Sequence, residues 1–166
     1  MGAAYNSGAW STFFSALVSA SASLTGLLFV AVSINLSRIV EQRYLPSRAA
    51  KALATLMSVL LSSILCLVPG QRITALGWEL VVLGAAAWIA ITWWQRESSV
   101  GNPYITRRHT IFHWILAEAS ALPLLIGGIS FAAQKGGGFC WLVIGAMLSF
   151  IAAMLDAWVL LIEIQR

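Results

Sequence analysis

Two carboxylates interrupt an apolar stretch at the end of this chain. Asp156 and Glu163 stand seven residues apart in the segment "AMLDAWVLLIEIQR". In a helix that spacing is two turns, so both side chains project from the same face, which Ser149 and Ala152 continue away from the C-terminus. An ionised carboxylate inside a membrane costs about 2.5–3.5 kcal/mol. If this segment spans a membrane, its acidic face must therefore contact protein or water and not lipid.

Other polar side chains stand at a similar level in the neighbouring apolar segments. Depth can be counted at a helical rise of 1.5 Å per residue from the helix ends on the side of the C-terminus. By this measure Asp156 lies roughly 8 Å deep, Glu118 roughly 10 Å and Asn35 roughly 4 Å. His113 and Arg38 are available partners on neighbouring segments. We expect one polar layer, in which the acids either attract or relay a cation or proton, or fix helix register through contacts with Asn35, Ser or Arg.

Further polar residues favour ordinary interfacial roles. His109 and His113 share a helix face, but "HTIFH" lacks the Glu of a zinc-protease helix and a third ligand, so we expect no metal site. Glu79, beside Trp78, is close enough to a segment end to snorkel to the headgroups. "KGGGF" lacks the ending of a phosphate loop, and no Gly-x-Ser-x-Gly elbow occurs. We expect no enzyme and no cofactor.

Composition places the chain in a bilayer. Hydrophobic residues make up 60% of it and charged residues only 10%, against about 25% charged in soluble domains. The mean hydropathy is +0.85. The net charge of +4 comes from basic residues in short connections beside apolar runs, so we expect contact with anionic lipid and no nucleic-acid partner.

Five apolar segments are each long enough to cross about 30 Å of hydrocarbon as a helix. Membrane strands would be about 10 residues long and would alternate apolar and polar residues. Pro and Gly mark the four breaks between the segments. The sequence predicts an all-α polytopic bundle, one integral membrane domain over residues 1–166. The predicted spans are approximately 12–36, 49–68, 74–94, 111–133 and 139–162.

The distribution of basic residues predicts the orientation. Eight of the ten fall on one side, which the positive-inside rule assigns to the cytoplasm, so that the N-terminus lies outside and the C-terminus inside. The two on the other side are Arg72 and Lys135. The eight are Arg38, Arg43, Arg48, Lys51, Arg96, Arg107, Arg108 and Arg166.

Small residues repeat every four positions on three of the segments. Such faces let helix backbones approach closely where no hydrophobic effect drives association, so we expect bundle packing in preference to a ligand groove, and the sequence leaves open whether some of these faces meet a second copy. The three faces are Ser15, Ser19, Ala22, Ser23 and Gly26; Ala50, Ala54, Ser58 and Ser62; and Gly145, Ser149, Ala153 and Ala157.

The stretch "SLTGLLFVAVSINL", together with the terminal "DAWVLLIEI", resembles a family of small bacterial integral membrane proteins of unknown function. Some members carry a label as modulators of a membrane AAA protease. The resemblance implies a bacterial inner-membrane location and a fold, but it assigns no functional residue.

These observations support two functions. The first is a small, homo-oligomeric transport or channel-like protein that uses intramembrane acids for a cation or proton. The second is a non-enzymatic accessory or regulatory subunit that binds another membrane protein through its small-residue faces.

The two cysteines, Cys66 and Cys140, lie at the predicted outer ends of the second and fifth spans. A disulfide between them requires Cα atoms within about 7 Å, and so requires these two helices to be neighbours. Free cysteine is also a common buried small hydrophobe, so both alternatives stay open.

Overall fold

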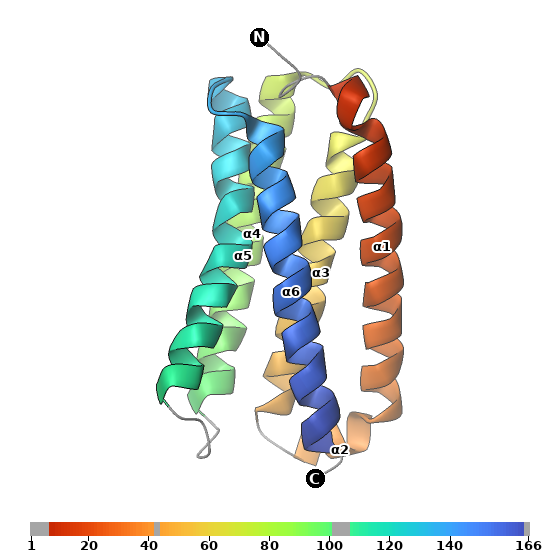
Figure 1. Cartoon of the computed structure of the whole chain (residues 1–166), viewed down its shortest axis with the longest axis vertical. Helices are drawn as coiled ribbons and strands as arrows, with labels where there is room; N and C mark the ends of the chain where they lie inside the picture. The colour runs from red at the N-terminus through yellow and green to blue at the C-terminus, as the bar shows by residue number, and fades with distance from the viewer. Residues whose placement is uncertain (1–6, 42–43, 101–106, 165–166) are drawn as a thin grey trace.

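The computed structural model describes residues 7–41, 44–100 and 107–164 of the chain (Figure 1). Helices are the only regular elements in these ranges, so the predicted all-α fold is confirmed. The helices are α1 (Ser7–Ile34), α2 (Leu36–Glu41), α3 (Leu45–Cys66), α4 (Ile73–Val100), α5 (Arg107–Ala133) and α6 (Gly138–Ile164).

Five of these helices are long and apolar enough to cross a membrane, and they match the five predicted segments to within a few residues. The short helix α2, between the first two spans, was not predicted. The spanning ranges are Trp10–Ile34, Leu45–Cys66, Ile73–Ser98, Ile111–Ala133 and Gly138–Ile162. The protein is therefore a membrane protein with an α-helical bundle.

Proline and glycine set the helix ends, as the breaks in the sequence indicated. Pro46 lies in the first turn of α3, where its missing N–H costs no intrahelical bond. Between α5 and α6, Gln134, Gly136 and Gly137 have φ values of 53°, 89° and 72°. Glycine adopts this left-handed region without steric cost, so the chain reverses tightly after α5.

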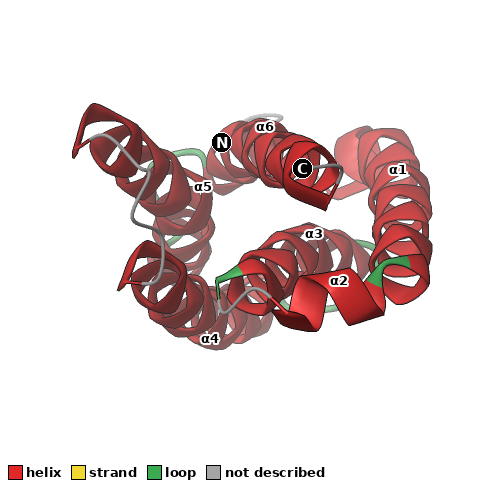
Figure 2. Ribbon diagram, turned by 90° about the horizontal axis from the view of Figure 1, so that it is seen from below, coloured by secondary structure: helices red, strands yellow, loops and turns green. Residues whose placement is uncertain are grey.

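The five long helices run side by side along the long axis of the molecule (Figure 1). Helix α3 packs against α1, α4 and α6, while α5 packs against α4 and α6. Seen from below, α1 stands at one edge of the bundle and the α4–α5 pair at the other (Figure 2). The end of the bundle that carries α2 is called the α2 end below.

Glycines allow the backbones of α4 and α5 to approach closely. A Cβ atom added to Gly128 would lie 2.7 Å from the backbone nitrogen of Val81, and one added to Gly77 would collide with the backbone of Ala132. These close approaches need glycine at both positions, because any larger side chain would force the helices apart.

The three small-residue faces differ in burial. Ser58 and Ser62 of α3 are buried, as are Gly145, Ser149 and Ala153 of α6, as expected for bundle packing. The face of α1 is exposed, and a Cβ on Gly26 would meet nothing within 4 Å. Packing of that face within the chain was a wrong expectation. The exposed face of α1 consists of Ser15, Ser19, Ala22, Ser23 and Gly26.

At the end opposite α2, the interior is aromatic and apolar. The rings of Phe131 and Phe139 meet edge to face with centroids 4.7 Å apart, and Phe14 lies 5.4 Å from Phe139. This buried group, which we call the aromatic cluster, also includes Cys66, Leu76, Leu80, Leu124 and Leu142. It fills this end of the bundle with mostly hydrocarbon side chains.

Candidate functional site

One face of α3 is polar and buried along most of its length. Its side chains follow one another at steps of three and four residues, which is the period of a single helix face. They cover about 21 Å of the helix at 1.5 Å per residue, compared with about 30 Å of hydrocarbon. This polar face of α3 consists of Arg48, Lys51, Thr55, Ser58 and Ser62, each less than 9% exposed.

Asp156 of α6 lies against the start of this face. Arg48 Nε is 3.2 Å from Asp156 Oδ1, and Lys51 Nζ is 2.8 Å from Asp156 Oδ2. The carboxylate is 1% exposed, so each of its oxygens is matched by a buried cation. A buried ion pair is costly to break, by about 3–5 kcal/mol, because one partner is then left as an uncompensated charge.

Two further helices complete this arrangement. Lys51 Nζ donates to Gln95 Oε1 of α4 at 2.6 Å, and Arg48 Nη2 lies 3.4 Å from His113 Nε2 of α5. A guanidinium only donates, so a hydrogen bond between these two atoms requires Nε2 of His113 as the acceptor. The ion cluster of Arg48, Lys51, Gln95, His113 and Asp156 thus connects four helices.

The ion cluster carries an excess of positive charge. Two basic side chains, Arg48 and Lys51, share a single acid, Asp156. A site of this sign does not attract a metal cation. The sequence pointed to the acid, but Arg48 and Lys51 were interpreted only as topology signals. The sequence did contain a signal for their burial. Arg48 and Lys51 precede Thr55 and Ser58 at steps of three and four residues, which places all four on one helix face.

The predicted polar layer is only partly assembled. Asp156 and His113 meet through Arg48, as described above. Glu118 lies elsewhere, on the α4–α5 pair, where Trp88 Nε1 donates to Oε2 at 2.7 Å and Thr92 Oγ1 lies 3.4 Å from Oε1. Asn35, between α1 and α2, donates to the carbonyl of Ala31 in the last turn of α1 at 2.9 Å.

Other predicted site residues have simpler positions. Arg38 is exposed on α2, and Glu79 is exposed and accepts a hydrogen bond from Gln71. The side chains of Glu163 and His109 lie outside the described part of the chain. Among the described residues, no group of three His, Cys, Asp or Glu side chains is placed to hold a metal ion.

Two small cavities follow the polar face of α3 into the bundle. The first lies beside Lys51 and Asp156 and is also lined by Thr55, His113 and Ser120. The second lies deeper, and Ser120 lines it as well. Each has a volume of about 10 Å³, which is room for about one water molecule.

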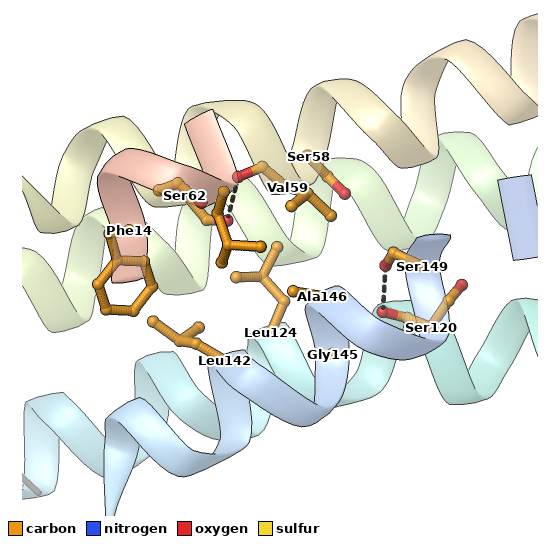
Figure 3. A pocket seen from close by; sticks show the side chains of 12 residues that line it. Phe14, Ser58, Val59, Ser62, Ser120, Leu124, Leu142, Gly145, Ala146 and Ser149 are labelled. Atoms are coloured by element: carbon orange, nitrogen blue, oxygen red, sulfur yellow. Dashed lines mark hydrogen bonds between the residues drawn. The ribbon is translucent and has the colours of Figure 1, made fainter. Parts of the chain in front are cut away.

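The deeper cavity is lined by hydroxyl groups from three helices. Figure 3 shows Ser58 and Ser62 of α3 opposite Ser149 of α6 and Ser120 of α5. Ser149 Oγ donates across helices to the carbonyl of Ser120 at 3.3 Å (Figure 3). On its far side the same cavity meets Phe14, Leu124 and Leu142 of the aromatic cluster. The cavity therefore ends against apolar side chains.

The hydroxyl groups along this line present acceptors to the cavities. Thr55 donates to the carbonyl of Lys51 at 2.9 Å, Ser58 to that of Thr55 at 2.7 Å and Ser120 to that of Ala117 at 2.8 Å. Because each hydroxyl proton points back along its own helix, the oxygen lone pairs stay available to a water molecule. The ion cluster and these two cavities together are called the polar seam.

The two cysteines are free thiols in this structure. Cys66 is buried in α3 and Cys140 is exposed in α6. Helices α3 and α6 are neighbours, which meets the first requirement of the disulfide, but the bridge itself is not formed here.

Comparison with protein-family models, with curated proteins and with solved structures finds no match to this chain. The arguments about function that follow rest on the geometry of the polar seam and on the surfaces of the bundle.

Proposed function

We propose that this protein is a small transport protein of the bacterial inner membrane that relays protons along the polar seam. One observation carries the proposal, namely the buried polar face of α3, which runs about 21 Å into the bundle. Buried ionisable residues inside a membrane span are costly and commonly mark ion or proton pathways. The proposed role needs no covalent chemistry.

Size favours a proton over a metal cation. Cavities of about 10 Å³ admit single water molecules, which can pass protons between hydroxyl oxygens. Asp156 is the group in the seam that can bind a proton and become neutral.

Proton uptake at Asp156 would change the ion cluster directly. A proton on Oδ2 replaces the salt bridge to Lys51 Nζ, and it leaves Arg48 and Lys51 without their shared anion. The ion pairs that hold α3 to α6 are then lost, which favours a shift of one helix relative to the other. Release of the proton restores the ion pairs. In this proposal Asp156 binds the proton and also links α3 to α6 through its salt bridges.

The proposed orientation places the α2 end in the cytoplasm. Eight of the ten basic residues belong to the helix ends and connections on that side. The ion cluster would then face the cytoplasm, and the aromatic cluster would close the seam toward the outside. We propose a homo-oligomer as the working form, with the exposed face of α1 as its contact surface.

Proton flux into liposomes that contain a pH-sensitive dye tests this function. Asp156→Asn should reduce the flux of the purified protein at least tenfold, whereas Glu118→Gln, which removes an acid outside the seam, should leave it within twofold. The proposal is abandoned if the wild-type protein conducts no protons. Equal loss in both variants would place the pathway elsewhere.

A second candidate function is that of an accessory subunit bound to another membrane protein. The exposed face of α1 favours it, because a row of Ser, Ala and Gly is typical of helix contacts inside membranes and is left unused within the chain. The resemblance to protease modulators agrees with such a role. In this case the ion cluster serves to fix the register of α3 and α6.

Purification from native membranes in mild detergent distinguishes the two candidates. A partner recovered at a fixed ratio, and lost in Ser19→Leu, supports the accessory subunit. A lone homo-oligomer supports the transporter. The matched control is Trp158→Leu, a change of an exposed residue on α6 away from this face.

A further inference from the structure

A long apolar groove lies between α1 and α6. Its volume is about 540 Å³, within the range of about 300–1,000 Å³ found for ligand pockets. Leu24, Leu28 and Val32 form the wall on α1, and Phe150 and Ala157 form the wall on α6. Figure 2 shows α1 standing apart from α6 on one side of α3, and Leu56 of α3 contributes to the lining. The groove is separate from the polar seam.

The groove is about as long as one membrane leaflet is thick. It extends along α1 from Leu24, near the middle of the Trp10–Ile34 span, to Asn35 at the α2 end. These eleven steps correspond to about 16 Å of helix, and half of the hydrocarbon core is about 15 Å. A helix from a partner or a second copy would cross the whole core of about 30 Å. The length of the groove therefore matches the acyl chain of one leaflet.

The chemistry of the groove changes toward the α2 end. Its walls are aliphatic and aromatic up to Asn35, which is the polar residue in the lining and lies toward the α2 end. Ile39 of α2 closes this end, and Arg38, the preceding residue, is exposed. This is also the end that carries most of the basic residues. Basic residues at the membrane surface attract anionic lipid headgroups.

We infer that the groove between α1 and α6 binds an anionic phospholipid of the leaflet at the α2 end. Its acyl chain lies along Leu28 and Leu160, and its phosphate lies near Arg38. The lipid fills the space between α1 and α6 in this half of the bundle, whereas Phe14 and Phe139 join the two helices in the other half. The binding does not depend on proton relay or on a protein partner.

Lipid retention after purification tests this inference. The protein is reconstituted into vesicles of equal phosphatidylglycerol and phosphatidylethanolamine, extracted in mild detergent and examined by native mass spectrometry. The wild type should retain about one phosphatidylglycerol per chain. Ala31→Trp, which fills the groove from α1, should lower that retention at least fivefold.

Ala86→Trp is the matched control. Ala86 is exposed on α4 and does not line the groove, so the same substitution there leaves both the groove and the exposed face of α1 unchanged. Retention in Ala86→Trp should equal that of the wild type. Equal loss in both variants, or none in Ala31→Trp, would overturn the inference, as would a protein recovered in the groove at a fixed ratio.

Two further measurements do not depend on the folding of Ala31→Trp. In the wild type, phosphatidylglycerol with a photoreactive acyl chain should crosslink to peptides of α1 and α6 that line the groove. Crosslinks spread evenly over the outer helix surfaces would contradict lipid binding in the groove. Arg38→Gln should lower the preference for phosphatidylglycerol over phosphatidylethanolamine about fivefold. An unchanged preference would exclude the proposed headgroup contact.

Discussion

Lys51 Nζ and Asp156 Oδ2 lie 2.8 Å apart in the interior of the bundle, 105 positions apart in the sequence. Arg48, one turn earlier on α3, occupies the other oxygen of the same carboxylate. The contact joins the second membrane span to the last. It explains how an acid can stand in an apolar helix, because the charge is matched by cations that are buried with it.

Removal of this carboxylate should destabilise the protein. Asp156→Ala leaves Arg48 and Lys51 buried without an anion, so we expect a loss of about 3–5 kcal/mol. Thermal unfolding in detergent, followed by the loss of monodisperse protein, measures the effect. The double variant Lys51→Met with Asp156→Asn should recover part of the stability. Equal loss in Glu118→Gln would contradict this account.

The α4–α5 contact should depend on glycine. Gly77→Leu places a side chain against the backbone of Ala132, so we expect destabilisation of at least about 1–3 kcal/mol. Gly26→Ala on α1 is the control, since its Cβ would meet nothing within 4 Å. The same unfolding assay applies. A Gly77→Leu protein as stable as the wild type would show that α4 and α5 are not so closely packed.

Truncation of the aromatic cluster should open the polar seam. Phe139→Ala removes the ring that contacts Phe14 and Phe131, and we expect a stability loss of about 3–5 kcal/mol together with a severalfold higher proton flux. Ile129→Ala, on the exposed side of α5, is the control for both readouts. Unchanged or lower flux in folded Phe139→Ala would show that the cluster does not close a pathway.

The two thiols should differ in reactivity. Cys140 is exposed and should react with a maleimide in the folded protein, while buried Cys66 should react only after denaturation. Intact mass after alkylation without reductant gives the count. Two alkylations in denaturant exclude the disulfide. None without reductant and two with it would establish the bridge, against the free thiols of the structure.

Cysteine labelling should locate the α2 end. In a background with Cys66 and Cys140 replaced by Ser, we expect an impermeant reagent added from the periplasm to label Lys135→Cys, between α5 and α6. It should miss Arg96→Cys, an exposed position near the end of α4. The expectation follows from the excess of basic residues at the α2 end. The reverse labelling pattern would invert the orientation, and with it the proposed direction of the polar seam.

Local patterns in the sequence determined the helices of this protein. Apolar runs longer than 20 residues predict membrane spans, because the backbone in lipid must satisfy its own hydrogen bonds. Pro46 and the glycines at 136 and 137 mark helix ends for steric reasons that need no tertiary contact. The demand that Asp156 face away from lipid also followed from the sequence, since the cost of a charge in hydrocarbon does not depend on the fold.

The tertiary structure decided which side chains meet. Depth along a helix can be counted from the sequence, but the rotation and neighbours of each helix depend on packing with distant segments. For this reason Glu118 and Asp156, at similar depth, lie in different parts of the bundle, and Arg48 and Lys51, which resembled topology signals, pair with Asp156. The exposed face of α1 and the groove beside α6 arise in the same way, because only the placement of α1 at the edge of the bundle leaves them open.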